Sequence, residues 1–251
     1  MSTPLSIQLY TLREEAKKDF FGVLEMLAET GYKGVEFAGL HDKTATEVAA
    51  KLADLGLKTS SSHVGFPTSE NIHELADTEK TLGNSLLISG FGPDDFKDSE
   101  ALTQTIDRFQ TAVALVKAEG LKFGIHNHWW EFTTIDGRLA YETLLEAVPD
   151  LFGELDVYWV AVGGLNVADL IARNAARLPL LHIKDGPGVQ GQAHVAVGSG
   201  TLDFAPIVAA ADPNVLEWLV VELDECDTDM TEAVKQSYKF LTESGLASGN
   251  K

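Results

Sequence analysis

The residues best suited to chemistry in this chain are histidines, carboxylates, a tyrosine and a lysine that close six apolar segments. They are Glu36, His63, His126 with His128, Asp156 with Tyr158, His182 with Lys184, and Glu222 with Asp224. Side chains two positions apart on a strand point to the same face, so each pair would present both of its groups together. Imidazole and carboxylate groups without a thiolate are typical ligands of Mn²⁺, Mg²⁺, Co²⁺, Fe²⁺ or Zn²⁺, and the sequence does not choose among these metals.

A single histidine at a strand end is most often a packed core or rim residue. Six strand ends with such groups are harder to explain by packing, because a buried charge is costly unless it is paired or bound to a metal. The pattern therefore predicts a metal or catalytic centre.

Eight short apolar segments must position these groups. They cover residues 5–9, 34–38, 58–63, 85–89, 122–128, 153–159, 178–183 and 218–223, with amphipathic helical patterns between them, as at 20–29, 44–55, 101–118, 141–147, 167–177 and 231–243. Strands that alternate with helices pair in parallel, and eight such strands close a barrel. The alternative, an open doubly wound sheet, needs a glycine-rich turn after its first strand, and Leu9-Tyr-Thr-Leu-Arg13 contains no glycine. We therefore predict a single (β/α)8 TIM barrel domain over residues 1–251, with the polar strand ends at its mouth.

Local signals refine this reading. Thr44 and Asp229 are predicted helix N-caps, and Gly31 and Gly56 are predicted to end helices in the left-handed conformation. The segment Gly198-Ser-Gly200 is interpreted as a turn rather than as a phosphate site.

Composition narrows the partners. The chain has 38 acidic and 19 basic residues, a net charge of −19, which argues against nucleic acid because phosphate binding needs lysine and arginine. No apolar run is long enough for a membrane span. The single cysteine, Cys226, excludes an internal disulfide, and the sequence begins without signal-peptide features, so we expect a cytoplasmic protein. A homo-oligomer is compatible with the sequence.

Several motifs together resemble the sugar phosphate isomerase/epimerase superfamily, the xylose-isomerase-like TIM barrels related to hydroxypyruvate isomerase, ketose 3-epimerases and inosose dehydratase. The motifs are Gly34-Val-Glu36-Phe, Ser62-His63, His126-Asn-His128-Trp-Trp-Glu131-Phe, Leu155-Asp156-Val-Tyr-Trp159, Leu181-His182-Ile-Lys184-Asp185 and Val221-Glu222-Leu-Asp. The resemblance spans essentially the whole chain.

The resemblance implies one divalent metal ion held by Glu131, Asp156, His182 and Glu222. Many relatives carry a glutamate at the strand end where this chain has His126, so His126 or His128 is the rival to Glu131 as first ligand. The alternative for Glu131 is a solvated acid on a surface loop.

The resemblance also implies proton abstraction next to the carbonyl of a sugar or keto-sugar, through an enediolate. Glu222 is the expected base, Glu131 acts on the opposite face, and His128 and Lys184 complete the catalytic set. The substrate-binding residues are expected to be Glu36, His63, His126 and Trp129. Three alternatives remain: Lys184 pairs with Asp156 or Asp185, Glu36 pairs with Lys184 or His63, and Trp159 packs in the core.

Rival functions share parts of this chemistry. A lyase would use the same enediolate to dehydrate a keto-inositol or to cleave a 3-keto-glycoside. An endonuclease for abasic DNA is disfavoured by the net charge of −19. A sugar-binding module without catalysis would not need acids on both sides of a metal.

Overall fold

Eight strands form one parallel sheet in the computed structural model, which describes residues 2–251 and leaves out Met1. In sheet order they are β1 (Leu5–Ile7), β10 (Trp218–Val221), β9 (Leu180–Ile183), β8 (Phe152–Asp156), β5 (Lys122–His126), β4 (Leu86–Ser89), β3 (Lys58–His63) and β2 (Gly34–Phe37). The two end strands, β1 and β2, approach through a parallel bridge between Gln8 and Glu36 and a 3.0 Å hydrogen bond from Lys33 N to Leu5 O. The sheet is therefore a nearly closed barrel, and the predicted (β/α)8 fold is confirmed.

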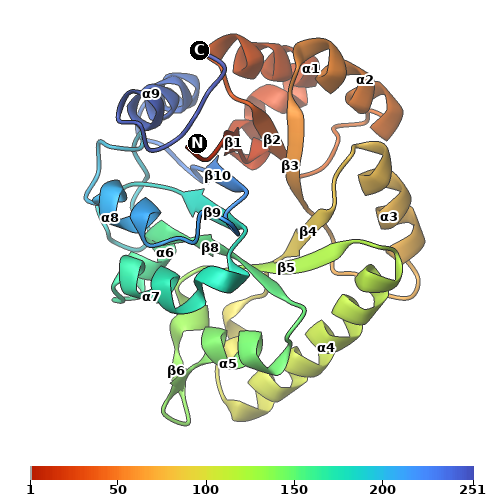
Figure 1. The fold of residues 1–251 in the computed structure, drawn as a ribbon, viewed down its shortest axis with the longest axis vertical. Coiled ribbons are helices and arrows are strands. Elements are labelled where there is room, and N and C mark those ends of the chain that lie inside the picture. The colour runs from red at the N-terminus through yellow and green to blue at the C-terminus, as the bar shows by residue number, and fades with distance from the viewer. Residues whose placement is uncertain (1) are drawn as a thin grey trace.

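Helices surround this barrel on its outside (Figure 1). They are α1 (Arg13–Thr30), α2 (Ala45–Leu55), α3 (Ile72–Thr81), α4 (Ser99–Ala118), α5 (Ala140–Ala147), α6 (Val157–Val162), α7 (Val167–Asn174), α8 (Phe204–Ala209) and α9 (Met230–Glu243). The 3₁₀ turns Leu9–Leu12, Pro93–Phe96, Trp130–Phe132 and Ala175–Arg177, and the hairpin of β6 (Thr134–Ile135) and β7 (Arg138–Leu139), lie in the connections. None of the helices described over residues 2–251 is both long and apolar enough to cross a membrane.

The predicted helix ends are confirmed. Thr44 forms a capping box with Glu47 at the start of α2, and the Asp229 side chain accepts a hydrogen bond from Glu232 N at the start of α9. Gly31 and Gly56 end α1 and α2 with φ angles of 115° and 68°.

Five strand predictions extend one to three residues past the observed ends, those of β1, β2, β5, β8 and β10. β5 ends at His126, and β8 ends at Asp156, whose side chain accepts a hydrogen bond from Trp159 N at 2.9 Å and caps α6. Tyr158 therefore lies on a helix, and its predicted position on the same strand face as Asp156 is wrong. The sequence is ambiguous here, because aspartate is also a common helix N-cap. The short apolar segment after Asp156 is compatible with a strand and with a helix.

The interior of the barrel is apolar at one end and polar at the other. Its lower part is an apolar floor made of Leu86, Ile88, Phe152, Leu180 and Val220. Gly124 is required there, because a Cβ at this position would lie 2.2 Å from the Phe152 ring. Side chains two residues further along each strand point the same way, so Glu154 lies above Phe152 and His182 above Leu180. Barrel interiors are usually filled by branched apolar residues, and this one becomes polar above its floor.

Candidate metal centre and active site

Four buried side chains from neighbouring strands converge at the mouth of the barrel. His126 ends β5, Asp156 ends β8, His182 lies in β9 and Glu222 follows β10. Each offers a ligand atom within 4.8 Å of the others, and all four side chains are buried. We call these residues the mouth group. Three members, Asp156, His182 and Glu222, are residues for which the sequence predicts metal binding, while the fourth is His126 and Glu131 is not in the group.

The ammonium of Lys184 already contacts the carboxylates of this group. Its Nζ lies 3.1 Å from Asp156 Oδ2, 2.9 Å from Glu222 Oε2 and 2.8 Å from Asp224 Oδ2, and the side chain is fully buried. Burial alone would lower the pKa of Lys184, but the three carboxylates outweigh it and hold the pKa well above its usual range. Of the two predicted partners of Lys184, Asp156 is the one that it contacts.

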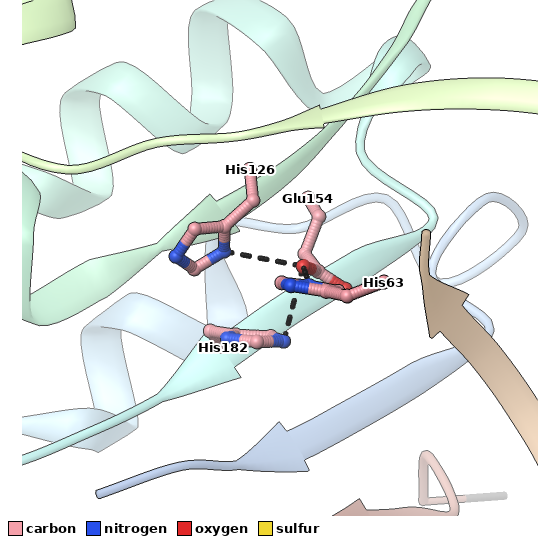
Figure 2. A group of neighbouring side chains, drawn as sticks. All are labelled: His63, His126, Glu154 and His182. Carbon is pink, nitrogen blue, oxygen red and sulfur yellow. Dashed lines mark hydrogen bonds and ion pairs between the residues drawn. The ribbon is translucent and has the colours of Figure 1, made fainter. Parts of the chain in front are cut away.

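A second cluster contains His63, His126, Glu154 and His182. We call it the deep group, because Glu154 lies two residues before Asp156 on β8 and therefore deeper in the barrel. Figure 2 shows the three imidazoles arranged around the Glu154 carboxylate. Oε2 of Glu154 lies 2.6 Å from His63 Nε2, 3.1 Å from His126 Nδ1 and 3.1 Å from His182 Nε2. Its other oxygen, Oε1, is buried and accepts no hydrogen bond from the described residues. His126 and His182 belong to both groups.

Glu36 borders the deep group from β2. Its Oε1 accepts a hydrogen bond from Gln8 Nε2 at 2.6 Å and lies 2.7 Å from His182 Nε2, while Ser61 Oγ donates to its Oε2. Of the two predicted partners, Glu36 is near His63, at 3.3 Å. Burial, together with the neighbouring charge of Glu154, raises the pKa of Glu36 to about 7.

The imidazoles have different electrostatic surroundings. Burial lowers the pKa of His126 to about 3. Burial opposes protonation of His182 too, but Glu154, Glu36 and Glu222 outweigh it and raise its pKa well above the usual value. His182 contacts acids at both ring nitrogens, because Nδ1 lies 3.0 Å from Glu222 Oε2 while Nε2 faces Glu36 and Glu154.

An open cavity of about 560 Å³ lies over these groups. The predicted site residues that line it are His63, His126, His128 and Glu222, and further lining comes from Tyr10, Arg13, Ala38, Gly90, Phe91, Asp224 and Glu225. Glu222 and His128 face the same space, so a small molecule there would lie between a carboxylate and an imidazole. Burial, with the Lys184 charge, lowers the pKa of His128 to about 4, so this imidazole is neutral at pH 7.

Glu131 lies behind His128 rather than in either group. It is fully buried, so the alternative of a solvated loop acid is wrong. Its Oε2 accepts a hydrogen bond from His128 N at 2.8 Å, and its Oε1 lies 4.0 Å from His128 Nδ1. Burial raises the pKa of Glu131 to about 8.

Aromatic rings surround His128. The Trp130 ring stacks on it with the centroids 4.2 Å apart and 13° between the planes, and Trp129 packs against Trp130 and Trp159 at 4.6 and 4.9 Å. Trp159 is buried, in agreement with the core-packing alternative. The rings and Glu131 together hold His128 at the edge of the cavity.

The glycine-containing loop after β9 is closed on a carboxylate of this chain. Asp185 accepts hydrogen bonds from the backbone N–H groups of Gly198, Gly200, Thr201 and Leu202 at 2.9–3.3 Å. These donors are those that a phosphate would use, so the interpretation of Gly198-Ser-Gly200 as a turn agrees with the structure.

Glu154 and Gln8 belong to the site although the sequence did not predict them. Glu154 lies within β8 rather than at its end, and Gln8 directly follows the short strand β1. The available signal was the spacing of Glu154 two residues before Asp156, which puts both carboxylates on the inner face of β8.

Comparison with known proteins supports this architecture. The sequence matches the xylose isomerase-like TIM barrel family over residues 24–244. This chain belongs to that family. No curated protein matches it at a significant level.

Solved structures of the same fold cover nearly the whole chain. A sugar phosphate isomerase/epimerase from Parabacteroides distasonis ATCC 8503 is 24% identical, with a TM-score of 0.81 over 99% of this chain and 96% of that one. The probable 3-DHS dehydratase AsbF from Bacillus anthracis is 14% identical, with a TM-score of 0.77 over 96% and 99%. The IOLI protein, whose structure holds a zinc atom, is 16% identical, with a TM-score of 0.75 over 98% and 98%. At these identities the likeness shows the fold.

The mouth group fits a divalent cation by its own chemistry. Two carboxylates and two imidazoles supply oxygen and nitrogen donors within 4.8 Å of one another. A buried cluster of His, Asp and Glu could thus bind a metal ion, and the donor set does not fix which one.

Proposed function

We propose that this protein is a metal-dependent isomerase or epimerase that removes a proton next to the carbonyl of a sugar or keto-sugar. One observation carries the proposal: two members of the mouth group, His126 and Glu222, line a cavity that His63 and His128 also line. A cation bound there by His126, Asp156, His182 and Glu222 would supply Lewis-acid polarisation of the substrate carbonyl. His126 takes the place of Glu131 in this ligand set, because Glu131 lies outside the cluster.

Glu222 is the proposed base. Burial alone would raise its pKa, but Lys184 and His182 outweigh burial and hold the pKa well below its usual range, so the side chain is a carboxylate at neutral pH. It lines the cavity and can receive a carbon-bound proton from substrate.

His128 is proposed to act from the other side of the substrate. Its neutral ring can donate one hydrogen bond and accept another, and can therefore return a proton or hold a hydroxyl. Glu131 acts as a positioning residue, since it bonds the backbone of His128 rather than the cavity.

Lys184 is proposed to stabilise negative charge that develops on the substrate oxygens. Its ammonium is fixed by three carboxylates and needs little reorganisation during the reaction. His63, which lines the cavity, would hydrogen-bond a substrate hydroxyl, and Glu36 beneath it would fix the ring. Trp129, for which the sequence predicts substrate binding, is not among the residues that line the cavity, and its ring packs against Trp130 and Trp159.

The test is proton exchange in heavy water. The protein, supplied with Mn²⁺, Mg²⁺ or Co²⁺, is incubated with a panel of ketoses and 3-keto sugars, and deuterium at the carbon next to the carbonyl is followed by NMR. We expect exchange and a new stereoisomer or aldose–ketose product, with a roughly 10²- to 10⁴-fold loss of rate in Glu222→Gln. A matched control is Glu79→Gln, which removes another buried carboxylate that bonds Ser62 and Asn84 outside the site.

The product of the reaction distinguishes an isomerase or epimerase from a lyase. A new double bond or a released aglycone would assign the protein to the lyases instead. Absence of exchange on the whole panel, with ligand binding retained, would favour a sugar-binding module.

A further inference from the structure

We propose that the deep group is a second, nitrogen-rich cation position that takes Zn²⁺ and competes with the mouth group for a single ion. The donors are His63 Nε2, His126 Nδ1, His182 Nε2 and a carboxylate oxygen of Glu154. Three imidazoles and one carboxylate form a donor set typical of zinc, whereas the mouth group has one imidazole fewer and one carboxylate more and therefore favours zinc less strongly. Ion binding is measured without substrate, so its failure would leave the proposed reaction untouched.

The three nitrogen–oxygen contacts at Glu154 are shorter than the ligand–ligand distances of a filled site. With metal–ligand bonds of about 2.1 Å, tetrahedral ligand atoms lie about 3.4 Å apart. The three nitrogens now lie 2.6, 3.1 and 3.1 Å from Glu154 Oε2. An ion would therefore widen these contacts by roughly 0.3–0.8 Å.

Two further observations favour a ligand at this depth. Oε1 of Glu154 is buried and accepts no hydrogen bond from the described residues, so the carboxylate has a coordination position to spare. Glu36 is a second buried carboxyl group at its edge, and a divalent ion would favour the ionised form of both acids. His63 and His126 line the cavity, which gives an ion a path inward.

The two positions exclude one another because they share two rings. A neutral imidazole has one lone pair, so each ring can bind one ion at a time. His182 turns Nδ1 toward Glu222 in the mouth group and Nε2 toward Glu154 in the deep group. Zinc bound at the deep group would therefore occupy His182 and His126, which could then no longer bind an ion at the mouth group.

Variants can separate the two positions, since each has two residues of its own. His63→Gln and Glu154→Gln alter the deep group alone, and Asp156→Asn and Glu222→Gln alter the mouth group alone. Glu79→Gln again serves as the buried-carboxylate control. Zinc is titrated into the chelator-treated full chain by calorimetry, Co²⁺ is followed by its visible spectrum, and Mn²⁺ by electron paramagnetic resonance.

We expect one Zn²⁺ per chain, with affinity lowered at least roughly 10- to 100-fold in His63→Gln and Glu154→Gln and nearly unchanged in the other variants. Mn²⁺ should show the reverse pattern and should be released by zinc. Zinc binding that is lost in Asp156→Asn and Glu222→Gln but kept in the deep variants would overturn the proposal, as would two zinc ions bound at once or none. His63 is partly exposed at the cavity, so we expect His63→Gln to fold. This variant tests zinc binding at the deep group even if Glu154→Gln does not fold.

Discussion

Nε2 of His182 lies 2.7 Å from Oε1 of Glu36, and both side chains are completely buried inside the barrel. When His182 binds an ion through Nδ1, its Nε2–H points at this carboxylate, which fixes the tautomer and the orientation of the ring. Such carboxylate–histidine pairs raise the basicity of the ligating nitrogen.

Glu36→Gln should therefore weaken Mn²⁺ binding at the mouth group by roughly 10- to 100-fold, although glutamine keeps an acceptor oxygen. Calorimetric titration of the metal-free protein measures the change, with Glu79→Gln as control. An affinity equal to that of the unchanged protein would mean that Glu36 does not orient His182.

Lys184→Met should destabilise the metal-free protein. The ammonium is fully buried between Asp156, Glu222 and Asp224, and its loss leaves their negative charges without a partner. Removal of one member of a buried ion pair typically costs about 3–5 kcal/mol, which urea denaturation would register. Mn²⁺ should restore part of this loss, because a cation at the mouth group replaces the missing charge. Unchanged stability with no effect of Mn²⁺ would argue against this role.

Glu131→Gln should change how stability depends on pH. Burial raises the pKa of folded Glu131 to about 8, whereas an unfolded glutamate titrates near about 4.3. The protonated form is thus favoured by folding, and its contribution to stability is present below about pH 4.3 and is lost as the pH rises toward 8. Glutamine does not ionise as the pH rises, and its side-chain oxygen can still accept the hydrogen bond from the His128 backbone N–H. The melting temperature of the variant relative to the unchanged protein should therefore rise from pH 5 to pH 9, and a difference that does not vary with pH would contradict the shift.

Gly124→Ala should destabilise the floor of the barrel. The added Cβ would lie 2.2 Å from the Phe152 ring, and overpacking of this kind costs about 1–3 kcal/mol. Adding Phe152→Leu should recover part of the loss, since the smaller side chain gives way. If the double variant is less stable than both single variants, the contact between the added methyl group and Phe152 is not the cause of the loss in Gly124→Ala.

The sequence predicted most of the fold because each strand is a short apolar run between amphipathic helices. It also indicated Asp156, His182 and Glu222, which stand at strand ends where a charge is conspicuous. Glu154 and Gln8 escaped notice because their burial depends on the barrel interior turning polar above Phe152, a property of eight strands together. The position of Glu131 likewise depends on the turn Trp130–Phe132, which carries its side chain inward.

The two ends of the described chain are joined side by side, since Ser248 N donates to Thr3 O at 2.8 Å and Leu5 N donates to Ser248 O at 3.1 Å (Figure 1). They meet at the start of β1, on the opposite end of the barrel from the cavity. The backbone is thus close to a continuous ring. A short peptide linking the two ends, with new ends opened in an outer loop, should yield a circular permutant whose cavity is undisturbed, and a fusion partner attached at either end should leave the path to the cavity open.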